Sequence, residues 1–366
     1  MNRKPYLYSI EYIRGVSMLG VIGIHVGSQY LMNPTPNLQL VALFEIVSRF
    51  SVPIFFFVSA FGLFYKINLD EPFDYKNFLR RRFKAVLLPY LIWSVLYIVH
   101  DNFFYGSGIP APAYALEILF FGLAKYQLYF LVILIWFYLL MPVWIKIVRK
   151  MTRKKLFVLL FLQIAFDYFS SYSAELSNFI YSLPHDSILR LFLMWRLNYL
   201  VLHYVFIFIL GGVLAVRTED FFAKMAENKK LISAIFFLAL ISLLTYFYYL
   251  VEVKNFSPEA AVNTAHQLSP PGIFYTIAAS IFFFMLFESV KLPKKICSLL
   301  GYLGKNSYFV YLFHPLAITY LITFLSKINQ VMNAPTAIIF YFAVVGVSLA
   351  ANEIYLQKIK SVIKIC

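Results

Sequence analysis

The chain has 366 residues, of which 61% are hydrophobic and only 13% are charged, whereas soluble domains average about 45–50% apolar and 25% charged residues. This composition excludes an ordinary soluble enzyme and indicates a membrane protein with many spans. The formal net charge of +15 does not indicate nucleic-acid binding, because the basic residues alternate along the chain with hydrophobic segments.

The hydrophobic segments predict an all-α, polytopic membrane domain over residues 1–366, with no soluble domain. Crossing the hydrocarbon core takes about 20 apolar residues, and ten segments approach or exceed this length. Most of the 32 Lys and Arg residues fall in every second connection, which predicts that both termini are cytoplasmic. The composition also indicates a bacterial inner or plasma membrane. The segments centre on Leu19, Ile54, Leu96, Ile135, Leu162, Ile207, Leu240, Ile281, Phe313 and Val344.

The first predicted helix, from about residue 8 to residue 30, contains Glu11, Arg14 and His25. An ionisable side chain at mid-bilayer costs about 2.5–3.5 kcal/mol and therefore needs an explanation. Arg14 and His25 are expected on one helix face, about 16 Å apart along the axis, because the residues between them make about three turns. Glu11 precedes Arg14 by one turn and can pair with it.

Further ionisable residues follow in the second and ninth predicted helices. Glu45 and Arg49 form an i, i+4 pair in the second helix. His314 lies near the middle of the ninth helix, where the neighbouring Pro315 removes one hydrogen bond of the helical ladder. Between them, the basic stretch RRRFKAVLLPYLIW at residues 80–93 is predicted on the cytoplasmic side, before the third helix.

Two connections on the predicted outer side have features of their own. Residues 113–123 are apolar but too short to span, so a re-entrant or interfacial helix is predicted there. The longest outer connection, about residues 170–198, is a candidate lid or acceptor-binding surface.

The buried charges allow two explanations. Any one of them could be a satisfied polar contact between helices, whereas the set favours a polar path through the bundle. A histidine near the outer face can act as a general base, and arginines near the cytoplasm suit a phosphate-bearing ligand. An enzyme that transfers a group across the membrane and a transporter could both use such a path.

Four segments, in this order, resemble acyltransferase family 3, whose bacterial members modify surface polysaccharides, lipopolysaccharide and peptidoglycan. Glu11, Arg14 and His25 match the family's opening pattern of an acidic residue, an arginine and a histidine. In the second segment, Ala60 stands where the family usually has glycine. The other three segments are RFSVPIFFFVSAFGL (49–63), YQLYFLVILIWFYLLMPV (126–143) and GYLGKNSYFVYLFHPL (301–316).

The chain departs from the family pattern at several positions. Gln127 stands where many members have histidine, and Tyr129 where many have tryptophan. The family's paired basic motif before the third helix is best matched by Arg81 and Lys84. A plain positive-inside signal explains the same basic residues equally simply. The candidates in this stretch are Arg80, Arg81, Arg82 and Lys84.

The resemblance implies transfer of an acyl group, most often acetyl, from cytoplasmic acyl-coenzyme A to a glycan hydroxyl at or beyond the outer face. The coenzyme is then a co-substrate, and no bound cofactor or metal is expected. By this resemblance His25 is the catalytic histidine, Arg14 holds the donor or stabilises developing negative charge, and Glu11 orients Arg14. Residues 80–84 would meet the phosphates of the coenzyme. Further candidates for the substrate path are Glu45, Arg49, Gln127, Tyr129 and His314.

Two other functions remain compatible with the sequence. A transporter or flippase of glycan intermediates also needs a polar path, and a structural subunit of a polysaccharide export complex needs no catalytic residue. Many family members contain an extracytoplasmic hydrolase-like domain that completes the transfer. Without that domain, either a glycan-biosynthesis partner protein performs this step or the membrane domain acylates the glycan directly.

Overall fold

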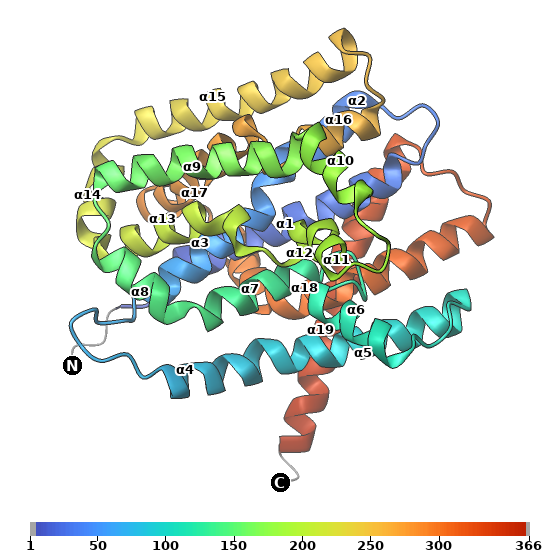
Figure 1. Ribbon diagram of the computed structural model, residues 1–366, viewed down its shortest axis with the longest axis horizontal. Coiled ribbons are helices and arrows are strands. Elements are labelled where there is room, and N and C mark those ends of the chain that lie inside the picture. The colour runs from blue at the N-terminus through green and yellow to red at the C-terminus, as the bar shows by residue number, and fades with distance from the viewer. Residues whose placement is uncertain (1–4, 364–366) are drawn as a thin grey trace. The chain divides into compact units, whose positions relative to one another are not determined.

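The computed structural model describes residues 5–363, and side chains as far as residue 357. Arg3, Lys4 and Lys364, which contribute to the predicted cytoplasmic charge, lie outside the described residues. The described chain is helical and contains no strand (Figure 1), which confirms the all-α prediction.

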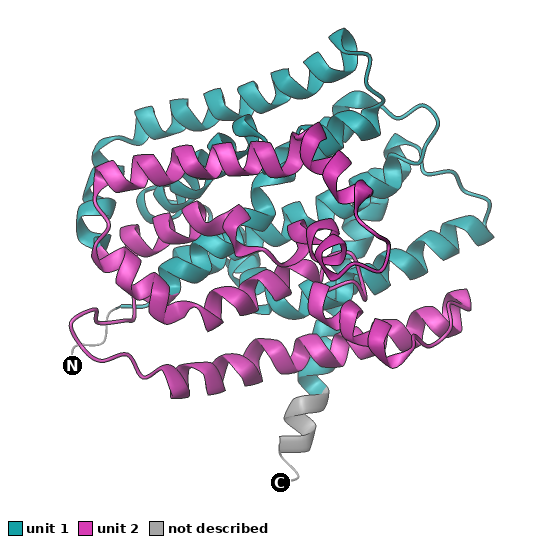
Figure 2. Ribbon diagram, in the orientation of Figure 1, with its two compact units in different colours: residues 1–62, 217–366 teal, residues 63–216 magenta. Residues whose placement is uncertain are grey.

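The chain divides into two compact units, which Figure 2 shows in different colours. Unit 1 comprises residues 1–62 and 217–366, and unit 2 comprises residues 63–216. The boundary falls within one helix, α3 (Ser51–Phe64). The expectation of a single acyltransferase-type domain over the whole chain stays a prediction.

Unit 1 contains the N-terminal helices and the C-terminal third of the chain. Its elements are α1 (Tyr8–Tyr30), α2 (Leu38–Val41), η1 (Ala42–Ile46), η2 (Val47–Phe50), α3, α14 (Thr218–Glu227), α15 (Lys229–Tyr248), η5 (Tyr249–Val253), α16 (Pro258–Thr264), α17 (Pro270–Ser289), α18 (Lys294–Lys327) and α19 (Ala334–Ile363). Unit 2 contains α4 (Tyr75–Arg82), η3 (Phe83–Leu87), α5 (Leu88–Tyr105), α6 (Pro112–Phe121), α7 (Tyr129–Leu139), α8 (Met141–Arg149), α9 (Arg153–Tyr172), α10 (Ala174–Ser182), α11 (Ile188–Met194), α12 (Arg196–Tyr199), η4 (Val201–Tyr204) and α13 (Val205–Val216).

Within the described residues, seven helices are long and apolar enough to cross a membrane, or nine if each of two bent helix pairs is one span. Helix α1 is the remaining segment of the ten predicted ones; it is continuous over 23 residues but contains Glu11, Arg14 and His25. The short helix α6 fits the expectation that residues 113–123 do not span. The exact number of spans and the side of each terminus therefore stay predictions.

One bent pair has a clear local cause. Helices α7 and α8 meet at Leu140 with an angle of 66° between them. Pro142 is the second residue of α8, and a proline inside a helix removes an N–H donor and clashes with the carbonyl of the residue four positions before it. A single straight span is therefore unfavourable here.

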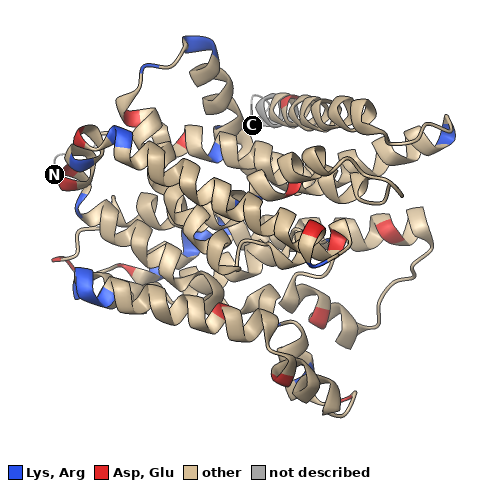
Figure 3. Cartoon of the chain, turned by 90° about the horizontal axis from the view of Figure 1, so that it is seen from above, with Lys and Arg blue, Asp and Glu red and all other residues tan. Residues whose placement is uncertain are grey.

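Charged side chains lie mostly at helix ends and in the connections, as Figure 3 shows. The long middle parts of the helices are largely uncharged (Figure 3). This distribution is the one that a hydrocarbon environment requires.

Helix α1 lies in the core of unit 1 because small residues let its neighbours approach closely. A Cβ atom added at Gly15 would lie 2.4 Å from the carbonyl oxygen of Leu300, and one added at Gly304 would lie 1.9 Å from that of Glu11. Close backbone approach through small residues is how membrane helices gain packing energy where the hydrophobic effect between them is absent. The crossing of α1 and α18 brings the two predicted histidine helices together.

The second predicted helix is interrupted in a way that the sequence did not reveal. It runs as one 27-residue span over Leu38–Phe64, but η1 is a π-helical turn and η2 a 3₁₀ turn. Such irregular turns are frequent at functional sites, because they change the direction of side chains within a helix. Glu45 lies in η1 and Arg49 in η2.

Candidate active site

The face of α1 that contains Arg14 and His25 has the predicted geometry, because α1 is one uninterrupted helix. Both side chains are half-buried, and they lie about 16 Å apart along the axis. The two residues therefore belong to different ends of the site. One small ligand group cannot contact both.

At the first end of α1, Glu11 is 7% exposed and accepts a hydrogen bond from the hydroxyl of Tyr6. Lys305 Nζ, on α18, lies 4.0 Å from Glu11 Oε2. Burial, followed by the hydrogen bond to Glu11, raises the pKa of Tyr6 to about 12, so Tyr6 stays protonated and donates at neutral pH. The predicted pairing of Glu11 with Arg14 stays a prediction.

At the other end, His25 stacks on His314 of α18. The ring centroids lie 5.3 Å apart and the planes differ by 24°. His314 is fully buried, and its Nδ1 lies 3.1 Å from the carbonyl oxygen of Val310. Because a carbonyl only accepts, Nδ1 is the protonated nitrogen of a neutral His314 and Nε2 has the free lone pair. Within the described residues, that Nε2 atom has no hydrogen-bond partner.

Helix α18 continues past Pro315, which lies inside its 34 residues. Proline has no N–H to offer to the carbonyl of Tyr311, four residues before it. One hydrogen bond of the ladder is therefore missing next to His314, as the sequence predicted, but the helix does not end there. The side chain of His314 makes its own bond to the ladder one position earlier.

The ion pair of Glu45 in η1 and Arg49 in η2 contacts α1 about one turn after His25. Arg49 donates to Glu45 over 3.0 Å, and their side chains are only 12% and 1% exposed. Ser28 Oγ, three residues after His25, donates to Glu45 Oε1 over 2.9 Å. Gly27 makes room for this carboxylate, since a Cβ there would lie 2.9 Å from Glu45 Cγ. The predicted Glu45–Arg49 pair is thus present and is tied to the histidine helix.

Arg49 also donates to the carbonyl of Val262 over 3.3 Å, which fixes the side chain to the loop-flanked helix α16. Its Nε is buried without a hydrogen-bond partner in the described part of the chain. A buried guanidinium N–H that is left unused costs free energy, so this atom is available to a polar group of a ligand.

The remaining predicted residues lie in unit 2. Gln127 is buried and 2% exposed, immediately before α7, and Tyr129 is the first residue of that helix. Within the predicted coenzyme-binding group, Arg80, Arg81 and Lys84 are exposed, and Arg82 is half-buried.

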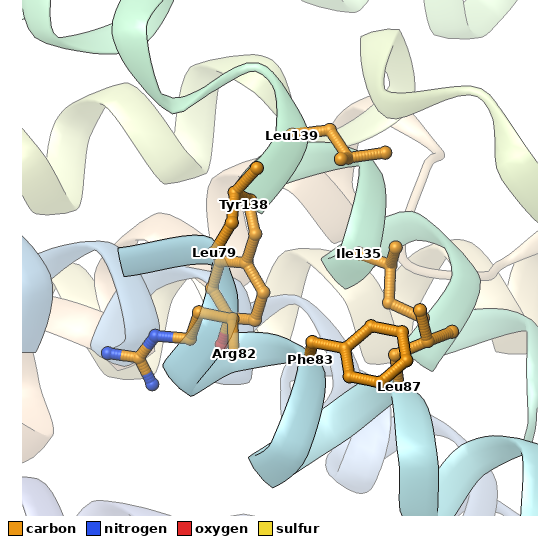
Figure 4. Close-up of a pocket in the computed structure, with 7 residues that line it drawn as sticks. All are labelled: Leu79, Arg82, Phe83, Leu87, Ile135, Tyr138 and Leu139. Atoms are coloured by element: carbon orange, nitrogen blue, oxygen red, sulfur yellow. The ribbon is translucent and has the colours of Figure 1, made fainter. Parts of the chain in front are cut away.

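Arg82 lines a small apolar cavity. Its guanidinium carbon lies 5.4 Å from the ring centre of Phe78 and 5.1 Å from that of Tyr138, which is the range of cation–π contacts. Figure 4 shows this guanidinium directed away from the apolar side chains of the cavity. The cavity measures about 110 Å³ and is lined by Leu79, Arg82, Phe83, Leu87, Ile135, Tyr138 and Leu139.

Sequence reasoning missed three members of the site in unit 1: Ser28, Tyr6 and Lys305. Ser28 had a usable signal, because it follows His25 by three residues on the same helix face. Lys305 had none, because its contact with Glu11 joins segments about 300 residues apart and depends on the crossing of α1 and α18. Tyr6 is only five residues from Glu11, but it precedes the start of α1, where no helical spacing predicts a contact. Within the described residues, no group of three His, Cys, Asp or Glu could hold a metal ion.

Comparison with known proteins identifies the family. A family model described as an acyltransferase domain matches residues 7–353, nearly the whole chain. No curated protein and no solved structure matches. The residues on which the resemblance was based all fall inside the matched range, and the helical membrane architecture agrees with it. The chain therefore belongs to acyltransferase family 3 and is a multi-pass membrane acyltransferase.

Proposed function

We propose that the protein transfers an acyl group, acetyl in the simplest case, from acyl-coenzyme A to a hydroxyl of a cell-envelope glycan in a bacterial cytoplasmic membrane. One observation supports this proposal above the others. His25, the histidine of the family pattern, stacks on the buried His314 beside the Glu45–Arg49 pair. This arrangement holds an imidazole next to polar groups inside an otherwise apolar bundle.

In the proposed reaction, His25 takes the proton of the acceptor hydroxyl as general base. The hydroxyl oxygen attacks the carbonyl carbon of the acyl thioester, the carbon–sulfur bond breaks, and the coenzyme thiolate leaves with its electron pair. His314 is a positioning residue, because its stacked ring restricts the orientation of the His25 ring. The hydrogen-bonding groups of Ser28, Glu45 and Arg49 would receive other hydroxyls of the sugar.

The separation of about 16 Å between Arg14 and His25 supports one of two roles for Arg14. It is too long for Arg14 to stabilise charge that develops on the acyl carbonyl at His25. An extended donor can reach both, with its anionic part at Arg14 and its thioester at His25. We therefore assign Arg14 to donor binding.

The exposed cations of α4 and η3 support binding of the donor phosphates, as guanidinium and ammonium groups do elsewhere. The apolar cavity beside Arg82 would accept an uncharged part of an acyl donor. Partners expected on this proposal are the acyl donor, the glycan acceptor, the lipid bilayer and, where a further transfer step is needed, a glycan-biosynthesis protein.

The test is label transfer in purified protein reconstituted into lipid nanodiscs. With radiolabelled acetyl-coenzyme A and an envelope saccharide, label is expected in the saccharide and free coenzyme A in equal amount. His25→Gln should abolish both while leaving the melting temperature unchanged. Saccharide crossing a sealed vesicle without acquiring label would instead favour a transporter, and label transfer that survives His25→Gln would exclude the proposed base.

A further inference from the structure

A second set of side chains, in unit 2, has an arrangement that neither the family pattern nor the proposed function uses. Asp167 and Ser170 lie on α9, and His203 lies on η4. His203 Nδ1 is 2.7 Å from Asp167 Oδ1, and His203 Nε2 is 3.4 Å from Ser170 Oγ. Asp167 is 0% exposed, His203 is 2% exposed and Ser170 is 3% exposed.

The hydrogen-bond pattern fixes the direction of each bond. An ionised Asp167 can only accept, so His203 Nδ1 is the donor and Nε2 is left as an acceptor. Ser170 Oγ–H must then donate to Nε2. Gln163 Nε2 donates to the second oxygen, Asp167 Oδ2, over 2.8 Å and so holds the carboxylate in place. The order is hydroxyl, imidazole, carboxylate, with the carboxylate itself oriented, which is the arrangement that activates a serine as a nucleophile.

An arginine from the following segment closes over the serine. Arg196 donates to Ser170 Oγ over 3.2 Å and to the carbonyl of Ser170 over 2.6 Å. Burial lowers the pKa of Arg196 from its usual value, but an arginine stays charged at neutral pH. A fixed cation within hydrogen-bond reach of Ser170 Oγ is close enough to stabilise the oxyanion that forms on the carbonyl oxygen of an acyl group attacked by Ser170.

The segment that contains Arg196 has few fully buried residues, although Phe192 and Tyr199 pack on the rings of Phe120 and Phe121 in α6. It consists of α10, α11 and α12, which follow the end of α9 (Figure 1). Helix α10 has one buried residue, Ile180, and α11 and α12 have none. Segments with few buried contacts open at low free-energy cost. Ser170, two residues before α9 ends, is therefore covered by Arg196 of α12, and the neighbouring helix α10 is the part of this segment that opens at the lowest cost.

We infer that Ser170 is a second reactive centre, which takes the acyl group as an ester, and that α10–α12 form its lid. The inference rests on the proposed function for its donor, an acyl thioester or ester. Ser170 Oγ forms a bond to the acyl carbonyl carbon while its proton passes to His203 Nε2. The carbon–sulfur or carbon–oxygen bond of the donor breaks, and the leaving group takes the proton from His203. A glycan hydroxyl then attacks the ester by the reverse steps and releases Ser170.

A purely structural role explains less of this cluster. Gln163 already joins α9 to the start of α13, because it donates to the carbonyl of Leu202 over 2.8 Å and accepts from the N–H of Phe206 over 3.0 Å. The contact between Ser170 and His203 is not needed for that connection. An apolar pair of similar volume would also avoid the cost of a buried carboxylate.

The experiment uses a fluorophosphonate probe, which reacts with activated serines and needs neither an acyl donor nor a glycan. Full-length protein in nanodiscs is incubated with the probe, and the labelled peptide is identified by mass spectrometry. Labelling of Ser170 is expected, and it should be about 100-fold slower in His203→Gln, as for loss of a general base. Absence of label on Ser170 in the folded wild-type protein would overturn the inference, as would a rate unaffected by His203→Gln.

Ser171 supplies the matched control. Its Oγ is buried and has no hydrogen-bond partner in the described part of the chain, so Ser171→Ala should leave labelling unchanged, whereas Ser170→Ala should remove it. Failure of this inference is distinguishable from failure of the proposed function. Saccharide labelling without a reactive Ser170 removes only the inference, and a reactive Ser170 without saccharide labelling removes only the acyl donor and acceptor proposed above.

Discussion

The two units hold their buried histidines in different ways. In unit 1, His314 donates to a backbone carbonyl and stacks on His25. In unit 2, His203 donates to the carboxylate of Asp167. A carboxylate stabilises the imidazolium that forms when histidine takes a proton, and a carbonyl does so less. The comparison teaches that His203 is arranged to take a proton from a fixed neighbour, whereas the pair in unit 1 is suited to a hydroxyl that arrives with a substrate.

The strongest test of this difference is to replace His25 and His203 separately. His25→Gln is expected to lower saccharide acylation by about 100- to 10,000-fold, because it removes the general base. It should not change fluorophosphonate labelling of Ser170, whereas His203→Gln should slow it. Radiolabel transfer and probe labelling are measured on the same preparations. Equal effects of the two substitutions on probe labelling would show that the histidines do not act separately.

Unit 1 contains a buried and an exposed ion pair, and the buried pair of Glu45 and Arg49 should be the more sensitive to loss of one partner. Glu45→Gln leaves the Arg49 charge buried without its counter-ion, which is expected to destabilise the fold by about 3–5 kcal/mol. Asp220→Asn is the matched control, because Asp220 and Lys224 form an i, i+4 pair of the same spacing with side chains 56% and 51% exposed. That change should cost about 0–1 kcal/mol.

Denaturant unfolding in a mild detergent, followed by intrinsic fluorescence, compares the two variants. Similar losses for Glu45→Gln and Asp220→Asn would mean that water or lipid headgroups reach Arg49 and compensate its charge. The difference between the variants, rather than either value, tests the burial of the pair.

The sequence was sufficient for the elements whose signal is local. Apolar length predicted the spans, and the three- and four-residue spacings predicted the face shared by Arg14 and His25 and the Glu45–Arg49 pair. The departures arose where tertiary contacts decide. The π-helical and 3₁₀ turns between Ala42 and Phe50 have no proline or glycine to announce them, and the contact of His25 with His314 required knowledge of how α1 crosses α18.

The cluster of Asp167, Ser170 and His203 in unit 2 also depends on a tertiary contact that the sequence does not predict. Asp167 and Ser170 are one turn apart and could have been noticed as neighbours on a helix. His203 lies in a different element, and no spacing rule links it to them. Arg196 lies on the longest predicted outer connection, for which a lid was one of two expectations. Its bonds to Ser170 give that expectation a specific contact.

Gly304 in unit 1 and Gly212 in unit 2 differ in a testable way, because one faces a backbone and the other a side chain. Gly304→Ala places a Cβ 1.9 Å from the carbonyl oxygen of Glu11, so α18 must move away from α1. A loss of about 1–3 kcal/mol is expected, as for other overpacked sites. In unit 2, Gly212 faces the ring of Phe64 at 2.8 Å, and a side chain can move where a backbone cannot, so Gly212→Ala should cost less.

Gly346→Ala in α19 is the control for both, because a Cβ there has no atom within 4 Å. It should be neutral or stabilise by about 0.5–1 kcal/mol, as alanine does in a helix. Melting temperatures of the three variants in one detergent provide the comparison. If Gly304→Ala is as stable as Gly346→Ala, α1 and α18 do not cross at this distance, and the stacking of His25 on His314 loses its structural basis.

The smallest expected effect is on the KM for acetyl-coenzyme A, and it compares Arg82 in unit 2 with Arg49 in unit 1. Arg49 is fixed by a carboxylate, whereas Arg82 is held between the rings of Phe78 and Tyr138. Arg82→Lys keeps the charge but loses the flat guanidinium that lies against these rings, a change of about 0.5–1 kcal/mol. This corresponds to about a two- to five-fold rise in KM for acetyl-coenzyme A, with kcat unchanged, if Arg82 positions the donor.

Arg80→Lys, at an exposed arginine of the same helix, should alter KM less. A KM that responds to Arg80 and not to Arg82 would place donor binding on the exposed face of α4 rather than at the cavity.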